Sequence, residues 1–304
     1  MKSKIKRIAA RNWRLYVLML PALIWLITFA YVPMYGMIIA FKDYKGKLGI
    51  LGSPWAEPLL KHFSSFFSTS VAPQIIWNTV ALSLLTIIIS FPMPIIFALL
   101  LNQIKGRKKK KAIQTISLAP YFVSNVVAVS ILYVICAPSG FINTIIKAFN
   151  GGKALYLTST AEYFRTLYIS SNIWQTLGFS AIVYIAALAG VSWDYHEAAI
   201  MDGATKFKRI LYIDLPLIMP TIIIVFILNI GNIMSVGYEK AFLMQSGTNT
   251  SVSEIISTYV YKVGLQNAQF SFATAVGLFN AIVNFIILII ANTISRKVSD
   301  ISIF

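Results

Sequence analysis

The sequence predicts an all-α membrane protein with six transmembrane helices, from its composition and from the spacing of its charges. Hydrophobic residues make up 58% of the chain and charged residues only 12%, whereas soluble domains contain roughly 45–50% and 25%. Uncharged windows between consecutive charges are each long enough for about 20 apolar residues of spanning helix, but not for two helices with a loop. These windows are 15–41, 62–104, 112–146, 166–193, 215–238 and 263–295.

Within the windows we expect helices near residues 15–41, 75–101, 113–136, 169–190, 216–238 and 270–294. Six spans place both termini on the same side of the membrane. With the N-terminus inside, the inner segments hold 17 of the 26 Lys and Arg residues, and the positive-inside rule then predicts cytoplasmic termini. The basic run at 105–111 is expected to contact anionic lipids and to set the topology, and nucleic acid is not an expected partner.

Features of the ends and of single residues exclude several other classes. The first apolar run has 27 residues, more than the 7–15 of a secretory signal's core, so we expect it to remain as a span. Cys136 is the single cysteine, which rules out an intrachain disulfide, and we expect it to pack near the outer end of the third span. The sequence has no HExxH, GxSxG or phosphate-loop motif, so we predict no catalytic, cofactor or metal site in this chain.

A polar island interrupts the hydrophobic sequence between residues 194 and 216. The spacing of Asp194 and Glu197 is typical of a capping box, which predicts a helix that starts near Asp194. Gly203 can take the positive φ that ends a helix, and a second helical run is expected from Thr205 to about Ile213. Pro216 is suited to the first turn of the next span. The prediction is two short cytoplasmic helices joined by a bend.

The same island resembles the EAA loop of bacterial ABC importer permeases. Glu197-Ala198-Ala199, Gly203 and Ile213-Asp214-Leu215-Pro216 match the pattern E-A-A, three residues, G, nine residues, I-x-L-P. The resemblance implies the type I ABC importer fold and a loop that docks on a separate ATPase. The coupling residues would be Glu197, Ala198, Ala199, Asp202 and Gly203, with the alanines giving a small surface for a cleft on the ATPase. The alternative is an ordinary loop in which Glu197 only caps a helix.

Further motifs resemble carbohydrate-uptake permeases. These are a basic N-terminal arm, Leu20-Pro21 and Val32-Pro33 in the first span, and Asn78-Thr79-Val80 at the start of the second. Two others, Pro33-Met34-Tyr35-Gly36 and Ala40-Phe41-Lys42-Asp43-Tyr44, resemble the permeases for complex oligo- and polysaccharides that are called LplB-like. The resemblance implies a cytoplasmic arm (1–14), a first span with an outer loop (15–74), a permease core (75–294) containing the coupling loop (194–216), and a cytoplasmic tail (295–304).

The resemblance also implies a function and a set of partners. The chain would be the permease subunit of an ATP-driven, binding-protein-dependent importer that moves a complex oligosaccharide across a bacterial plasma membrane. Its partners would be a second, homologous permease, two copies of an ATPase that binds ATP and Mg, and a membrane-anchored extracellular binding protein. The alternatives are an importer of the same architecture for a peptide or amino acid, and a non-transporting scaffold or sensor subunit.

Polar side chains inside the spans are candidates for a substrate pathway. We expect no charge at membrane depth, which argues against ion or proton coupling. Amides and aromatic rings suit uncharged, hydroxyl-rich ligands, although amides also join membrane helices to one another. The candidates are Asn125 at mid-depth of the third span, Trp174 and Gln175 in the fourth, Asn229 and Asn232 on one face of the fifth, and Asn280 and Asn284 on one face of the sixth.

Three segments are expected to meet the binding protein or the membrane surface. The outer loops at 42–74 and 147–168 carry glycine, serine and aromatic residues with scattered charges. Residues 251–266 are predicted to form a helix with Ile255 and Ile256 on one side. That helix either lies on the membrane or, as the resemblance implies, dips toward the translocation path or the docked binding protein.

Overall fold

The computed structural model describes residues 12–235 and 237–299, where its regular elements are helices with one isolated β-bridge between Lys42 and Trp55. Six helices in that part are long and apolar enough to cross a membrane. They are Trp13–Phe41, Ala72–Asn102, Asn125–Phe149, Ala161–Ala189, Lys206–Ile230 and Phe270–Lys297. The all-α class with six spans is therefore confirmed. Of the predicted cytoplasmic arm and tail, residues 1–11 and 300–304 lie outside the described residues.

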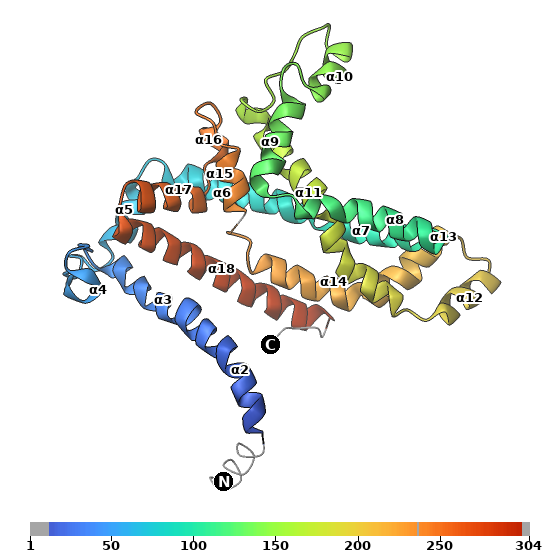
Figure 1. The fold of residues 1–304 in the computed structure, drawn as a ribbon, viewed down its shortest axis with the longest axis horizontal. Helices are drawn as coiled ribbons and strands as arrows, with labels where there is room; N and C mark the ends of the chain where they lie inside the picture. The colour runs from blue at the N-terminus through green and yellow to red at the C-terminus, as the bar shows by residue number, and fades with distance from the viewer. Residues whose placement is uncertain (1–11, 236, 300–304) are drawn as a thin grey trace. The chain divides into compact units, whose positions relative to one another are not determined.

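The chain forms two compact units (Figure 1). Unit 1 contains α2 (Trp13–Leu26), η1 (Ile27–Tyr31), α3 (Val32–Met34), η2 (Tyr35–Phe41), α4 (Gly49–Gly52), α5 (Lys61–Ser68), η6 (Lys262–Gln266) and the first nine residues, 270–278, of α18 (Phe270–Ser299). Unit 2 contains α6 (Ala72–Leu85), η3 (Thr86–Ser90), α7 (Pro92–Asn102), α8 (Arg107–Leu118), η4 (Ala119–Phe122), α9 (Asn125–Cys136), α10 (Phe141–Phe149), α11 (Ala161–Ala189), α12 (Trp193–Met201), α13 (Lys206–Arg209), η5 (Ile210–Asp214), α14 (Leu215–Ile230), α15 (Tyr238–Leu243), α16 (Thr250–Ser253), α17 (Ile256–Tyr261) and the rest of α18.

In unit 1, Lys42 organises the loop that follows the first span. Its Nζ donates to the carbonyl oxygens of Ile50, Leu51 and Ser53 at 2.8, 3.1 and 3.1 Å. The same atom lies 4.9 Å from the ring centroid of Trp55. The Lys42 residue is only 5% exposed, so the three carbonyls and the ring face replace the water that its ammonium group has lost.

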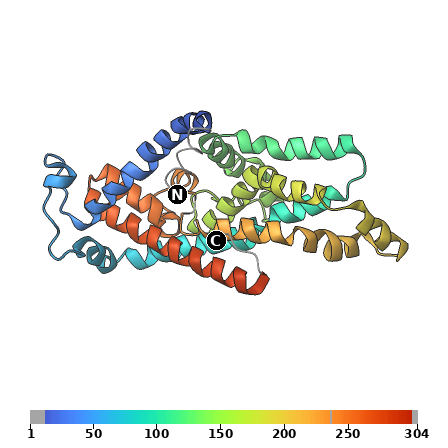
Figure 2. The same ribbon diagram turned by 90° about the horizontal axis from the view of Figure 1, so that it is seen from below.

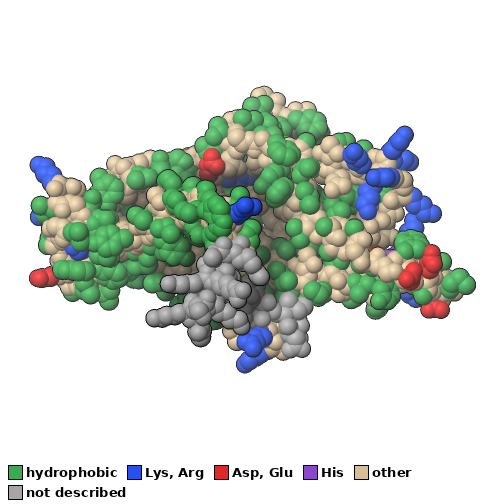
Figure 3. All heavy atoms as spheres, turned by 60° about the horizontal axis from the view of Figure 1, so that its bottom comes forward, with side chains coloured by type: hydrophobic (Ala, Val, Ile, Leu, Met, Phe, Trp, Pro, Cys, Tyr) green, Lys and Arg blue, Asp and Glu red, His purple; other side chains and the backbone are tan. Residues whose placement is uncertain are grey.

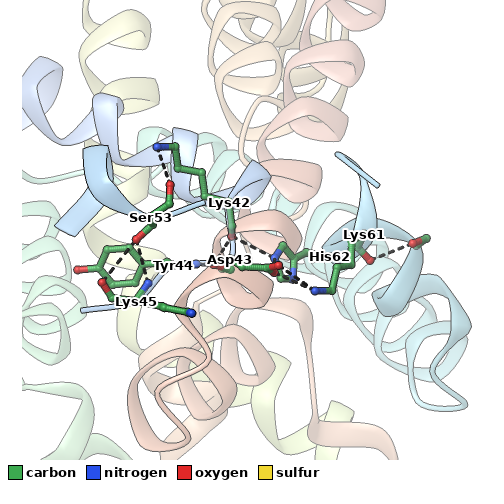
Figure 4. A network of polar contacts seen from close by, with 9 residues as sticks. Lys42, Asp43, Tyr44, Lys45, Ser53, Lys61 and His62 are labelled. Carbon is green, nitrogen blue, oxygen red and sulfur yellow. Dashed lines mark hydrogen bonds and ion pairs between the residues drawn. The ribbon is translucent and has the colours of Figure 1, made fainter. Parts of the chain in front are cut away.

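Asp43 and Tyr44 continue this network (Figure 4). The Asp43 carboxylate lies 3.0 Å from Lys61 Nζ and 3.1 Å from His62 Nε2, and the hydrogen bond from Lys61 is the main cause that lowers the pKa of Asp43. The backbone N–H of Tyr44 donates to Ser271 Oγ at 2.9 Å. Lysine, aspartate and tyrosine of the LplB-like motif therefore each anchor a different part of the loop.

In unit 2, the core is built around α11, which packs against α7, α8 and α14 (Figures 1 and 2). One buried cluster joins α11 to α7 and α14 through Tyr184, Leu99 and Ile218. A second cluster surrounds Phe164 and contains Cys136, which is fully buried. The burial predicted for this cysteine is confirmed, and its place near the outer end of a span stays a prediction.

Gly178 allows α11 to approach the end of α8. A Cβ built at this position would lie 2.2 Å from the carbonyl oxygen of Ser117, a distance that no side chain tolerates. Small residues at helix crossings are a common means of close packing between membrane helices. Next to this crossing, the rings of Tyr121 and Phe179 stack with their centroids 3.8 Å apart.

The predicted third span at 113–136 is wrong, because the helix breaks at Val123–Ser124. Both residues are extended, with ψ angles of 129° and 153°. Ser124 then caps α9, since its Oγ accepts from the N–H of Val127 at 3.4 Å. Pro120, just before the break, has no N–H to continue the helical pattern. The uncharged window at 112–146 therefore contains parts of two helices, α8 and α9, on either side of an extended dipeptide.

Two other spans begin earlier than predicted. α11 starts at Ala161 instead of near 169, and Arg165 is accommodated because it donates to Asn78 Oδ1 at 3.1 Å. The fifth span covers Lys206–Ile230 instead of 216–238. It runs through the π-helical turn η5, so Pro216 sits in the first turn of α14 without starting a separate helix.

The single helix predicted for residues 251–266 is interrupted at Glu254–Ile255. Ile255 and Ile256 are fully buried, and the N–H of Ile256 donates to Thr79 Oγ1 at 2.9 Å. The amide of Asn78 donates to the carbonyl oxygens of Ser251 and Glu254 at 2.9 and 3.1 Å. This segment packs against α6, so the alternative of a helix lying on the membrane surface is wrong here.

Candidate functional site

The predicted coupling loop begins with a short helix, α12. The helix starts near Asp194 as expected, but the predicted capping box is wrong. Ser192 is the capping residue, because its Oγ accepts from the N–H of Asp194 at 3.3 Å. Glu197 is exposed, and the N–H of Asp194 donates to Ser192 instead of to the Glu197 carboxylate.

α12 ends in a tight turn at Gly203. This glycine has φ of +74°, in the left-handed region that favours glycine, as predicted. The N–H groups of Gly203 and Ala204 donate to the carbonyls of Ile200 and Ala199 at 3.0 and 2.8 Å. Thr205 then caps α13 through a hydrogen bond from the N–H of Lys208. The bend at Gly203 is therefore confirmed, whereas the second helical run is the start of the fifth span and not a separate short helix.

The base of the predicted coupling loop is held by a polar group of three residues, two of which are buried. His196 Nε2 lies 3.3 Å from Asp214 Oδ1, and Gln103 Nε2 donates to Asp214 Oδ2 at 3.0 Å. Asp214 is 0% exposed and His196 is 6% exposed. The group links α12 to the start of α14 and to the end of α7, so α12 is connected to the helical core by side chains as well as by the chain itself.

The outer surface of the coupling loop combines small, charged and large apolar residues. Glu197, Ala198, Asp202 and Gly203 are exposed and Ala199 is half-buried. Figure 3 shows acidic and basic side chains gathered at the end of unit 2 that α8, α12 and α13 form. Large apolar side chains there are 57–87% exposed: Trp193, Tyr195, Met201, Phe207 and Tyr212. An exposed apolar patch with a polar rim is typical of a protein-binding surface.

A cavity of about 440 Å³ lies where the third span is broken. Val123, Ser124 and Asn125 form part of its wall. Gln175 on α11 donates to the carbonyl oxygen of Val123 at 2.8 Å. The remaining lining residues come from η4, α11 and the segment around α15: Tyr121, Tyr168, Asn172, Thr176, Gly237, Glu239 and Lys240.

Two charged residues, Glu239 and Lys240, line this cavity in addition to the amides and aromatic rings. Glu239 is exposed and accepts a hydrogen bond from the Asn125 amide. Lys240 is only 4% exposed. Both lie on α15, which follows the turn after α14, so the windows between charged residues could not reveal that they reach a cavity.

A second cavity, of about 420 Å³, adjoins the first, and the two share Tyr168, Asn172, Thr176 and Gly237. Its lining includes Asn229, Asn232, several hydroxyl groups and the ring of Phe91. The amides of Asn229 and Asn232 donate to backbone carbonyls four residues earlier, which leaves their oxygens available. Together the cavities form a hollow lined by polar and apolar side chains of α11 and of the chain before and after it.

The structure brings four of the seven predicted pathway residues to the cavities, namely Asn125, Gln175, Asn229 and Asn232. Asn125 is at the start of α9 instead of at mid-depth of a long helix. Trp174 lines neither cavity and is 45% exposed, because adjacent helical residues point about 100° apart.

Asn280 and Asn284 on α18 line neither cavity, although Asn284 contacts Ser235 in the wall of the second. Asn284 is buried and holds the turn after α14: its oxygen accepts from the N–H of Met234 at 2.8 Å and its amide donates to Ser235 Oγ at 3.0 Å. For this residue the alternative role in helix packing is the correct one. Asn280 is half-buried one turn earlier on the same helix.

Sequence reasoning missed Tyr121, Tyr168, Asn172, Thr176, Glu239 and Lys240 as cavity residues. Asn172 precedes Gln175 by one turn on α11 and Thr176 follows Asn172 by four residues, so helical periodicity from Gln175 was a signal that could have found them. No comparable signal exists for Lys240, because its position depends on the packing of a short helix.

Comparison with known proteins gives a consistent result. The family model described as "Binding-protein-dependent transport system inner membrane component" matches residues 90–300. The polygalacturonan/rhamnogalacturonan transport system permease protein YteP of Bacillus subtilis (strain 168) is 42% identical, over 100% of this chain and 95% of its own. Protein LplB of the same organism is 40% identical, over 97% of this chain and 92% of its own.

A similar solved structure is a crystal structure of a bacterial ABC transporter involved in the import of the acidic polysaccharide alginate. It matches with a TM-score of 0.89 and 37% identity, over 97% of this chain and 99% of that one. Since the family model, close relatives and a full-length structure agree with the fold described above, this chain belongs to the binding-protein-dependent transport system inner membrane components, the permease subunits of ABC transporters.

Proposed function

We propose that this chain moves a complex oligosaccharide across the bacterial plasma membrane, as the permease subunit of an importer driven by a separate ATPase. The observation that carries the proposal is the pair of adjoining cavities lined by amides, hydroxyls and aromatic rings. Such groups can replace the water bound to sugar hydroxyls, and aromatic rings such as those of Tyr121 and Phe91 contact the apolar faces of sugar rings. The cavities have the size of small-molecule sites.

The relatives support this class of substrate. YteP is named for polygalacturonan and rhamnogalacturonan, and a second solved structure with a TM-score of 0.89 is the alginate transporter in complex with an alginate pentasaccharide-bound periplasmic protein. By analogy, a separate binding protein would deliver the oligosaccharide to this chain, and we propose that this protein is anchored to the membrane. Most affinity would then reside in that protein, and the permease would hold the sugar weakly.

The coupling surface would be formed by Glu197, Ala198, Ala199, Asp202 and Gly203. Ala198 and Ala199 would allow close contact with the ATPase because their side chains are small. The exposed apolar residues around them would bury apolar surface against it. The link from His196 through Asp214 to Gln103 would pass movement of α12 to α14 and α7. ATP and Mg would bind to the ATPase, of which the complex would contain two copies.

A second, homologous permease would complete the complex, because two ATPases call for two coupling loops and this chain carries one. We propose cytoplasmic termini, for which the count of basic residues on the inner segments is the support. The basic residues of α8 would then face anionic lipid headgroups on the cytoplasmic side. In this arrangement, the domains would be the arm at 1–14, the first span and outer loop at 15–74, the core at 75–294 and the tail at 295–304.

The test is reconstitution of the assembled transporter in proteoliposomes with its ATPase, partner permease and binding protein. We expect oligosaccharide-loaded binding protein to stimulate ATP hydrolysis and to drive uptake of the sugar. Stimulation by a peptide or an amino acid in place of any sugar would support the importer of another solute. ATP hydrolysis that responds to sugar without any uptake would support a sensor subunit and contradict transport.

A further inference from the structure

Lys240 is a buried lysine in the wall of the first cavity. Its residue is 4% exposed, and its Nζ has no hydrogen-bond partner within the part of the chain that the structure describes. No ion pair to Lys240 occurs there either. An ammonium group taken out of water without a partner costs several kcal/mol, so such an arrangement needs a physical reason.

Among the described residues, Lys42 is also deeply buried, and it shows how hydrogen-bond acceptors stabilise a buried ammonium group. Lys42 is 5% exposed, but its Nζ has three carbonyl acceptors and the face of Trp55. Among the described residues, one buried lysine is therefore surrounded by acceptors and the other, Lys240, has none. A ligand that enters the cavity is a candidate for the missing partner of Lys240.

The neighbouring carboxylate does not fill this role. Glu239 is directly before Lys240 on α15, and consecutive side chains on a helix point about 100° apart. Its Oε2 instead accepts from the Asn125 amide. The lining of the first cavity thus contains an acid that is engaged with an amide and a cation that is not engaged.

Burial lowers the pKa of Lys240 to about 8. The amine is therefore still mostly protonated at pH 7 and below, and it presents a positive charge under ordinary conditions. A carboxylate is the natural partner, since a hydrogen bond between two charged groups is about twice as strong as one between neutral groups.

We infer that the first cavity binds an acidic sugar, and that Lys240 is the counter-ion for the carboxylate of its uronic acid unit. The amides of Asn172 and Gln175 and the hydroxyl of Thr176 lie on the same wall and would bind the sugar's hydroxyl groups. Tyr121, stacked on Phe179, offers an aromatic surface to the sugar ring. This inference rests on the proposed function. It adds the charge of the substrate and the residue that recognises this charge.

The test compares a galacturonate trisaccharide with its fully methyl-esterified form, which has the same length and ring stereochemistry but no charge. Binding of each is measured by calorimetry to the assembled transporter without the binding protein. We expect the acid to bind at least about tenfold more tightly than the ester, in line with hydrogen bonds to charged groups. Lys240→Met should reduce the acid to the affinity of the ester and leave the ester unchanged, while Lys240→Arg should retain the preference.

Lys153→Met is the matched control, because Lys153 is an exposed lysine that lines neither cavity. It should leave both affinities unchanged, and size-exclusion profiles of all variants check that the complex assembles. Equal affinities of the wild-type complex for the acid and the ester would overturn the inference. An acid preference that survives in Lys240→Met, or no binding of either sugar, would overturn it as well.

Failure of this inference can be separated from failure of the proposed function. The inference about the acidic sugar fails alone if the acid and the ester bind alike while a neutral oligosaccharide, delivered by its binding protein, stimulates ATP hydrolysis and uptake. If no sugar stimulates the transporter, the proposed function itself fails. The two measurements therefore give distinct results.

Discussion

His196 Nε2 lies 3.3 Å from Asp214 Oδ1, and both side chains are buried beneath the coupling loop. The two residues are 18 positions apart in the sequence, one in α12 and the other at the end of η5. A buried carboxylate needs partners, and Gln103 supplies only one of them. The contact thus makes the position of α12 depend on the start of α14.

Replacement of His196 by leucine should uncouple the loop from this base. The buried Asp214 would lose a partner, at a cost of about 1–3 kcal/mol, and sugar-stimulated ATP hydrolysis should fall. Tyr195→Leu is the control for thermal stability, since Tyr195 is the exposed neighbour. In a double-mutant cycle, His196→Leu should lower thermal stability much less when Asp214 has already been replaced by leucine. Losses of thermal stability that simply add would contradict the contact.

Ala198→Arg tests the docking surface. Ala198 is exposed on α12, so an arginine there leaves the fold intact but places a long charged side chain where the ATPase would sit. We expect normal insertion with uptake reduced at least about tenfold, which corresponds to 1.4 kcal/mol of lost coupling. Ala112→Arg, an exposed alanine in α8, is the matched control, and normal uptake by Ala198→Arg would refute the coupling role.

Gly178→Ala tests the crossing of α11 and α8. The new Cβ would lie 2.2 Å from the carbonyl oxygen of Ser117, so the helices must separate, at a cost of about 1–3 kcal/mol. We expect a lower thermal midpoint and weaker sugar transport, because Phe179 and Tyr121 would lose their stacking. Gly277→Ala on α18, where a Cβ meets nothing within 4 Å, should be tolerated. Equal midpoints for the two variants would show that the crossing is more adaptable than the structure indicates.

The Asp43 network should be sensitive to acid. The pKa of Asp43 is lowered from 3.8, chiefly by the hydrogen bond from Lys61, so its contribution is fully present above about pH 4. The contribution is lost as the pH falls through the lowered pKa in the folded protein. Hydrogen exchange across residues 45–60, corrected for intrinsic rates, should accelerate below pH 4.

Asp43→Asn should produce the same loosening of residues 45–60 at neutral pH, because the amide carries no charge to hold Lys61 and His62. Glu57→Gln is the control, since Glu57 is an exposed carboxylate in the same loop. Unchanged protection in Asp43→Asn would mean that the three carbonyl contacts of Lys42 are sufficient to hold the loop.

The spans and the bend at Gly203 could be predicted because each depends on local sequence. A spanning helix needs a continuous apolar run, and a positive φ favours glycine wherever the chain folds. Helix ends were harder: Arg165 lies inside α11 because Asn78, 87 residues away, accepts its hydrogen bond. The spacing of charged residues along the sequence does not reveal such a long-range contact.

The cavities could be predicted only in part, because they depend on contacts between distant segments. Gln175 and Asn229 were found as polar residues within apolar spans. Lys240 was missed since it is beyond the end of the fifth span, on a six-residue helix whose placement depends on tertiary packing. His196 was a similar case, because nothing near it in the sequence indicates burial against Asp214.

The break at Val123–Ser124 has a consequence for how a sugar could travel. In an unbroken helix the backbone amides and carbonyls bond to one another, so the helix offers a hydrated sugar only an apolar surface. An extended dipeptide releases backbone groups that must bond to something, and here Gln175 takes one of them. Because these bonds can be exchanged for bonds to hydroxyl groups at little net cost, the interruption would give a sugar on the proposed pathway a weak binding site.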